Sequence, residues 1–287
     1  MRVLVTGASG QLGSYLLREL VGSSHEVVAW SGARTGALQG VTLQSVDLTA
    51  SDCVSAAFTA ARPDVVIHAG AMASVAECLR DPPRARLVNV QGTALLATLS
   101  EQTRTRLIFV STDLVFDGEK APYSESDIPA PLSVYGRTKA EAELAVTAAR
   151  MGLVVRMSLL YGISVCGRPS FFDQQISALR ERRSMTLFDD EWRTPLFLDT
   201  AAQALAALAQ SECVGLLHVG GPERMSRFEM GQRTARALGL DPSVLVAARR
   251  SEARFTEPRP RDVSLDSSRW RHLFPQLAWP SLEEALS

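Results

Sequence analysis

The chain has 287 residues, of which 46% are hydrophobic and 21% charged, a balance that excludes a disordered or fibrous protein. Thirty basic residues against 31 acidic ones leave a net charge of -1, which gives no case for binding nucleic acid or an anionic membrane. No apolar run approaches the roughly 18 residues that span a bilayer, and the cysteines and histidines show no metal-ligand spacing. Because the amino terminus enters a strand-like run at once and the cysteines are scattered, we expect a cytoplasmic protein without a metal.

The first half of the chain alternates short β-branched runs with longer helical stretches. Expected strands are residues 3–6, 26–30, 41–46, 64–68 and 106–111, and expected helices are residues 11–21, 51–62 and 83–103. Short apolar strands separated by helices predict right-handed βαβ units and a parallel sheet covered on both faces. The expected fold is therefore α/β, with a Rossmann-like doubly wound parallel sheet.

The pattern changes after residue 111. Residues 113–132 hold three prolines, one glycine and five acidic residues without a period, which predicts a long loop of the kind that is usually functional. A helix over 134–150 and a strand over 153–157 are expected next, and later a capping box at Ser226 and Glu229 predicts a helix that Gly239 closes. We expect a first domain over residues 1–160 and a smaller, looser α/β domain over residues 161–287, with segments returning to the first.

A glycine-rich motif, GASGQLG, occupies residues 7–13, between the first expected strand and the first expected helix. Glycines at such a turn allow a tight bend and let a diphosphate approach the backbone, while the helix amides face the phosphates. The spacing is GxxGxxG instead of GxGxxG, and plain turn chemistry is the alternative reading. The flanking strand and helix favour dinucleotide binding.

A tyrosine and a lysine lie four residues apart in an expected helix, at Tyr135 and Lys139, and so share one helix face. Among the 30 basic residues only Lys120 and Lys139 are lysines, which speaks against an ordinary surface pair. A compact ammonium can stabilise a phenolate, so we expect Lys139 to lower the pKa of Tyr135. Ser111 and Thr112 end the preceding strand, where parallel sheets bind ligands, although a simple strand-end cap fits them equally well.

Together these motifs resemble the extended short-chain dehydrogenase/reductase group. The stretches STDLVFDG at 111–118, YSE at 123–125 and VYGRTKAE at 134–141 are more specific and resemble the dTDP-4-dehydrorhamnose reductase family. NVQGT at 89–93 matches the group's central helix, and RPRDVSLD at 259–266 resembles the family's C-terminal segment. The likeness covers nearly the whole chain.

The resemblance implies an NAD(P)H-dependent oxidoreductase that reduces a 4-keto nucleotide sugar, foremost dTDP-4-dehydrorhamnose to dTDP-rhamnose. Residues 1–160 would bind NAD(P), and residues 161–287 mainly the substrate. The expected catalytic residues are Thr112 to orient the ketone oxygen, Tyr135 to protonate it and Lys139 to hold the ribose. The expected substrate-binding residues are Thr112, Asp113, Val115, Tyr135 and Arg193. The expected cofactor-binding residues are Gly7, Ser9, Gly10, Gln11, Leu12, Ser31, Arg34, Asp47, Leu48, Ala69, Gly70, Ala71, Tyr135 and Lys139.

Two departures qualify the resemblance. Leu159 stands where the family often has an aromatic residue over the sugar, and Arg193-Thr194-Pro195 stands where it has Pro-Thr. Both departures concern the sugar and the base, not the triad. Asn89 is expected to brace the helix.

The end of the second expected strand bears on the choice of cofactor. Residues 28–31 read VAWS, without the Asp or Glu that usually accepts from the ribose 2′-hydroxyl of NAD. Ser31 could donate to a 2′-phosphate and Arg34 could pair with it. NADPH is therefore the expected cofactor, with NAD as the alternative and a solvated loop charge as the other reading of Arg34.

Three functions stay open at this point: the keto reductase, another extended enzyme such as a nucleotide-sugar epimerase or dehydratase, and a non-catalytic NADP-binding regulatory subunit. Enzymes of the second class are longer chains with an acidic residue at the end of the second strand, and neither feature is present here. The third can keep both the cofactor pocket and the triad. The nucleotide, the sugar and the oligomeric state, with a homodimer among the options, are not given by the sequence.

Overall fold

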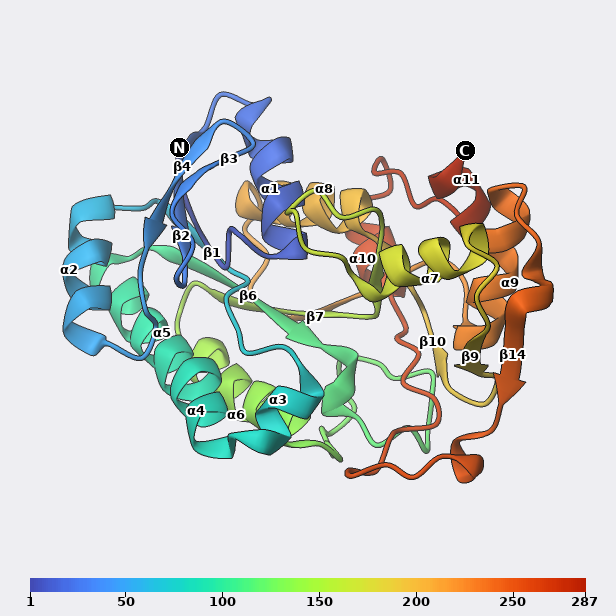
Figure 1. Cartoon of the computed structure of the whole chain (residues 1–287). Helices are drawn as coiled ribbons and strands as arrows, with labels where there is room; N and C mark the ends of the chain where they lie inside the picture. Colours follow the sequence, from blue (N-terminus) through green and yellow to red (C-terminus); the bar gives the residue numbers. More distant parts are fainter.

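A computed structural model describes residues 1–287, and a sheet of eight strands forms its centre (Figure 1). The strands are β1 (Arg2–Thr6), β2 (Glu26–Ser31), β3 (Gly36–Leu38), β4 (Val41–Ser45), β5 (Val65–His68), β6 (Arg106–Thr112), β7 (Gly152–Met157) and β12 (Gly215–Val219). Their order is β12-β7-β6-β5-β1-β2-β4-β3, and only β3 runs antiparallel to its neighbour. The order reverses beside β1, which confirms the predicted doubly wound α/β fold.

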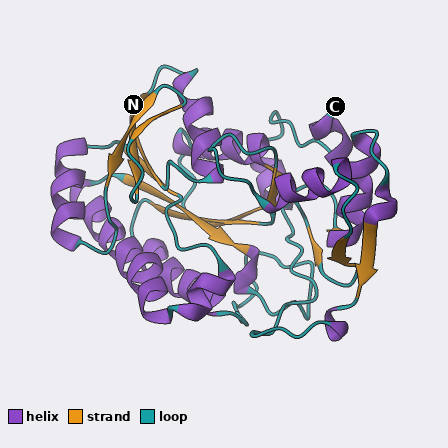
Figure 2. Ribbon diagram, in the orientation of Figure 1, coloured by secondary structure: helices purple, strands orange, loops and turns teal.

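Helices cover both faces of this sheet (Figure 2). One face carries α1 (Gln11–Val21), α8 (Leu198–Ala209) and α10 (Ser268–Leu273). The other face carries α2 (Ser51–Ala61), α5 (Gly92–Thr103) and α6 (Val134–Ala148). Successive residues of β1 serve the two sides, because Val3 and Val5 join the first apolar cluster and Leu4 the second. None of the helices has the length and apolar character that a membrane crossing requires.

The structure divides the predicted helix over residues 83–103 into three pieces. These are α4 (Pro82–Arg86), a π-helical turn η1 (Leu87–Gln91) and α5, which follow one another along the chain. In the first half of the chain two short elements escaped prediction, β3 and the helix α3 (Val75–Arg80), whose N-terminus is capped by Ser74. Both are too short to show a hydrophobic period in the sequence. The predicted loop over residues 113–132 contains only the 3-10 turn η2 (Asp113–Val115).

The second half of the chain builds a smaller group of elements at one end of the sheet (Figure 1). Its helices are α7 (Phe171–Arg180), α9 (Arg227–Ala237) and α11 (Leu282–Leu286), with 3-10 turns η3 (Pro242–Val244) and η4 (Arg250–Glu252). Its strands pair as β9 (Met185–Phe188) with β14 (Leu245–Ala248), β8 (Leu160–Tyr161) with β11 (Leu196–Phe197), and β10 (Trp192–Arg193) with β13 (Met225–Ser226). Ser226 caps α9 by accepting a hydrogen bond from the Glu229 amide at 3.0 Å. β12 leaves this group and pairs with β7 in the large sheet.

Candidate active site

A cavity of about 1200 Å³ lies at the carboxyl ends of β1, β5, β6 and β7, the edge where parallel sheets bind ligands. It brings together residues that lie far apart in the sequence, from Thr6 to Arg227. The predicted site residues that line it are Gly7, Ser9, Gly10, Gln11, Leu12, Ser31, Arg34, Asp47, Leu48, Ala69, Gly70, Ala71, Thr112, Asp113, Tyr135, Lys139 and Arg193. Val115 does not line it: its side chain is fully buried in an apolar cluster with Phe116 and Tyr123. The expectation that Val115 touches substrate therefore has no support in its position.

The glycine-rich turn forms one end of the cavity. Gly7 has a φ of +67°, and a Cβ there would lie 2.6 Å from the Gly70 amide nitrogen, so only glycine fits. A Cβ on Gly13 would lie 2.2 Å from the Gly7 carbonyl oxygen, so α1 packs directly on the turn. Gly10 is the N-cap of α1 and no side chain caps the helix. Its first amides therefore keep the hydrogen-bonding capacity that suits a dinucleotide diphosphate.

A loop from the second half of the chain crosses this turn, which the sequence did not indicate. The Gln11 side-chain amide donates to the Ser164 hydroxyl at 3.1 Å and to the Arg168 carbonyl at 2.6 Å. The Arg168 guanidinium donates to the Ser9 carbonyl at 2.9 Å. Residues 166–168 line the cavity as a result. The only sequence signal for them is a Gly-Arg pair in an irregular segment.

Ser31 and Arg34 both have partners within the protein. The Ser31 hydroxyl is buried and donates to the Arg34 carbonyl, which closes the turn after β2. One Arg34 nitrogen, Nη1, donates to the Cys166 carbonyl at 2.6 Å. The Ser31 hydroxyl is thus committed to its own turn, whereas the Arg34 guanidinium has further donors that can reach a phosphate.

Tyr135 lies in the first turn of α6, against the end of β6. Ser133 caps this helix by accepting from the Gly136 amide at 3.0 Å, and a Cβ on Gly136 would lie 2.3 Å from the Leu114 carbonyl. The close approach places the phenol next to Thr112. Burial and the nearby Asp113 carboxylate raise the pKa of Tyr135 above its ordinary value, while a hydrogen bond with Thr112 lowers it. The phenol is therefore protonated at neutral pH and can act as an acid.

Lys139 lies one turn further along α6 and is buried. Its ammonium donates to the Val110 carbonyl at 2.7 Å and lies 3.9 Å from the centre of the Phe109 ring. Burial lowers the pKa of Lys139 to about 7, partly opposed by Glu143. Burial and Asp113 raise the pKa of Tyr135 and Lys139 is not among the groups that shift it, so the expectation that Lys139 lowers this pKa finds no support in this arrangement.

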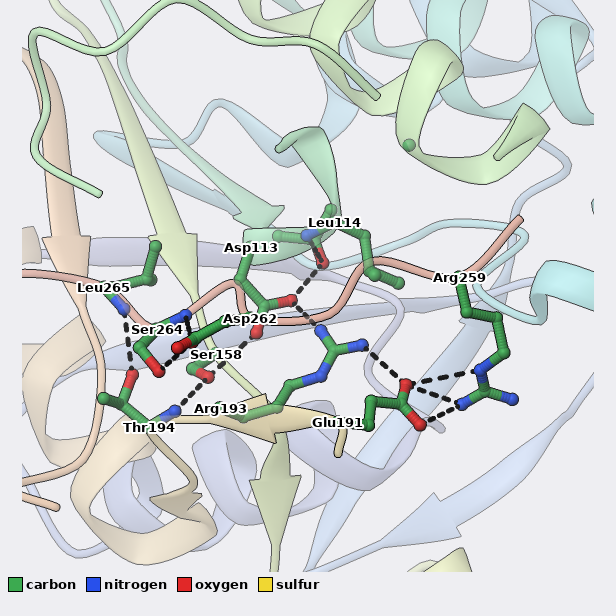
Figure 3. Close-up of polar contacts among 12 residues, drawn as sticks. Asp113, Leu114, Ser158, Glu191, Arg193, Thr194, Arg259, Asp262, Ser264 and Leu265 are labelled. Carbon is green, nitrogen blue, oxygen red and sulfur yellow. Dashed lines mark hydrogen bonds and ion pairs between the residues drawn. The ribbon is translucent and has the colours of Figure 1, made fainter. Parts of the chain in front are cut away.

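A chain of charges, buried at Asp113, Arg193 and Glu191 and exposed at Arg259, joins the two halves of the molecule (Figure 3). The Asp113 carboxylate accepts from the Arg193 guanidinium at 2.7 Å and from the Ser158 hydroxyl at 2.8 Å. Arg193 also lies 3.5 Å from Glu191, which in turn accepts from Arg259 at 2.8 Å. Arg193 lines the cavity, but both of its terminal nitrogens face carboxylates of the protein. The sequence does not predict the pairing of Arg193 with Asp113, because the two residues lie 80 positions apart.

Two buried polar residues brace the cavity wall. The His68 ring lies between the Thr6 hydroxyl at 2.6 Å and the Thr93 hydroxyl at 2.9 Å, and burial lowers its pKa to about 3. The ring is therefore neutral and structural. Asn89, in the π-helical turn η1, donates to the Thr138 hydroxyl at 3.0 Å and so ties this turn to α6.

Comparisons with known proteins agree with this geometry. The model of the family described as the RmlD substrate binding domain matches residues 1–286. A dTDP-4-keto-6-deoxy-D-glucose reductase of Streptomyces niveus is 31% identical over 273 residues, which cover 94% of this chain and 90% of the relative. Methionine adenosyltransferase 2 subunit beta of Pongo abelii is 30% identical over 287 residues, with 93% and 81% covered. The crystal structure of dTDP-4-dehydrorhamnose reductase from Bacillus anthracis str. Ames in complex with NADP has a TM-score of 0.88 and 25% identity, covering 99% of this chain and 96% of that one.

Proposed function

Because the chain belongs to the RmlD substrate-binding domain family, we propose that it is an NADPH-dependent reductase of a 4-keto nucleotide sugar, foremost dTDP-4-dehydrorhamnose. The observation that carries the proposal is the placement of Tyr135, Thr112 and Lys139 in one cavity with the glycine-rich turn before α1. A dinucleotide diphosphate suits that turn, since the first α1 amides have no side-chain cap.

The proposed chemistry divides between the cofactor and three side chains. NADPH, when bound, would supply the hydride for C4 of the sugar. The protonated Tyr135 phenol donates its proton to the ketone oxygen, and the Thr112 hydroxyl, which lines the same cavity, orients the oxygen. Lys139 remains within reach of a ribose while it is held by the Val110 carbonyl. The same proposal assigns residues 1–160 mainly to the cofactor and residues 161–287 mainly to the substrate, in a cytoplasmic protein that can form a homodimer.

A regulatory role is the second candidate, because the methionine adenosyltransferase subunit is as similar to this chain as the reductases are. Steady oxidation of NADPH separates the two. We expect multiple turnovers when dTDP-4-dehydrorhamnose is generated in the assay, and slower turnover with UDP- and GDP-linked 4-keto sugars. Cofactor binding without turnover of any of these compounds would favour the regulatory role.

We expect the Arg34→Ala variant to lose most of a preference for NADPH over NADH. The preference in the wild type should be about tenfold to hundredfold in kcat/KM, the size of one partly exposed charged hydrogen bond. Use of NADH should barely change, because NADH has no 2′-phosphate. An equal loss with both cofactors would instead mean that Arg34 acts only by holding the Cys166 carbonyl.

The pH dependence of catalysis should report on Lys139. A lysine whose pKa is lowered to about 7 is cationic below that pH and neutral above it, so kcat/KM for NADPH should fall as the pH rises through about 7. The Lys139→Arg variant stays cationic, so this decline should disappear while kcat and cofactor affinity both drop, because a planar guanidinium fits the space differently. A decline that persists unchanged in the variant would assign it to another group.

A further inference from the structure

Arg227 is a cavity-lining arginine with a buried nitrogen that has no hydrogen-bond partner. It is the first residue of α9, lines the cavity, and its guanidinium stacks on the Phe171 ring at 4.8 Å from the ring centre. Its Nη1 atom is buried and has no hydrogen-bond partner in the protein. Burial, together with the nearby Arg193, lowers the pKa of Arg227 to about 10, which still leaves it cationic at neutral pH.

The surrounding charges do not balance. The charge chain of Figure 3 contains two arginines, Arg193 and Arg259, which pair with the carboxylates of Asp113 and Glu191. Arg227 adds a third cation, attracted by Glu191 and repelled by the two arginines, without an ion pair of its own. A buried guanidinium without a partner is costly for a protein. These five groups carry an excess of one positive charge, and Arg227, which lines the cavity, therefore favours an anionic ligand there.

Helix stability does not explain Arg227. Ser226 already caps α9, and the N-terminal end of a helix carries partial positive charge, which disfavours a cation in the first turn. The residue is therefore better explained by a ligand than by the fold.

We propose that Arg227 binds the diphosphate of the nucleotide-sugar substrate. The inference rests on the proposed function and names the residue that would recognise the anionic part of that substrate. The diphosphate of the cofactor is the other source of the same chemistry. The substrate is favoured because Arg227 belongs to the half of the chain that contacts Asp113, next to Thr112, through Arg193. The cofactor diphosphate is expected at the other end of the cavity, at the glycine-rich turn before α1.

The test is calorimetric binding of dTDP, thymidine and NADPH to Arg227→Gln. We expect the Kd for dTDP to rise about tenfold to hundredfold, as for the loss of a charged hydrogen bond, with little change for thymidine and NADPH. Arg227→Lys should recover part of the dTDP affinity because it keeps the charge. Arg236→Gln, an exposed arginine of the same helix, is the matched control and should bind all three ligands like the wild type.

Other binding results would overturn either the assignment of Arg227 alone or the proposed function as well. Unchanged dTDP affinity in Arg227→Gln, or an equal loss for thymidine, would overturn the assignment of Arg227 while leaving the reductase proposal intact. A loss confined to NADPH would move Arg227 to the cofactor and overturn the inference in the same way. A wild-type protein that binds neither dTDP, UDP nor GDP would overturn the proposed function and the inference together. Thermal melting should show Arg227→Gln at least as stable as the wild type.

Discussion

Tyr135→Phe is expected to lower kcat by about 10²–10⁴, the usual contribution of a positioned general acid. The variant keeps the ring and its packing and removes only the proton that the ketone oxygen would receive. Because burial and Asp113 raise the pKa of the phenol, the wild-type group is protonated across the neutral range, so the loss should appear at every pH near neutrality. The Kd for NADPH, measured by fluorescence titration, should stay nearly unchanged.

Tyr161→Phe is the matched control for this variant. Tyr161 is a buried tyrosine that packs in the apolar cluster with Phe172 and does not line the cavity. We expect it to keep wild-type kcat. If Tyr135→Phe retained more than half of the wild-type kcat, Tyr135 would not be the acid.

Glu143→Gln is expected to lower the free energy of unfolding by about 3–5 kcal/mol, the effect of leaving one member of a buried ion pair alone. Glu143 and Arg156 are 4% and 2% exposed, and their closest side-chain atoms lie 2.7 Å apart. The amide keeps the shape of the carboxylate and can still bond to the Ser111 hydroxyl, so the loss measures the uncompensated Arg156 charge. Urea denaturation monitored by circular dichroism gives the difference.

Glu141→Gln provides the comparison in the same helix. Glu141 pairs with Arg86 at the surface, where both side chains are more than a third exposed. Exposed ion pairs contribute at most about 1 kcal/mol, so this variant should unfold nearly like the wild type. Equal losses in the two variants would show that the buried position of the Glu143 pair has no special effect.

The sequence predicted the sheet and the cofactor end of the cavity because these depend on local patterns. Continuous apolar runs such as that of β5, which is buried throughout, stand out from the helical stretches around them, and a Cβ at Gly7 or Gly13 would collide with backbone. Tyr135 and Lys139 share a helix face through their spacing alone. Local spacing therefore identified which residues meet in the cavity.

The electrostatics of the site could not be predicted in the same way, because they depend on burial and on distant partners. Lys139 was expected to act on Tyr135, yet its ammonium is held by the Val110 carbonyl and its own pKa falls. Arg193 meets Asp113 only after β10 has been brought to the end of β6. The sequence does not distinguish Arg227 from other helical arginines, because only the structure shows that its buried Nη1 atom has no hydrogen-bond partner.

The most direct test of the central claim is to follow a labelled hydride. The protein is incubated with NADPH carrying deuterium at the transferable C4 position and with dTDP-4-dehydrorhamnose, and the nucleotide-sugar product is analysed by mass spectrometry and NMR. Two labelled cofactors are tested separately, one with deuterium at the pro-R position of the nicotinamide C4 and one with deuterium at the pro-S position. We expect one deuterium at C4 of the sugar from one of the two labelled cofactors, in step with NADPH oxidation, and almost none with Tyr135→Phe. Oxidation of NADPH without deuterium at C4, or no reaction with any 4-keto nucleotide sugar, would contradict the central claim.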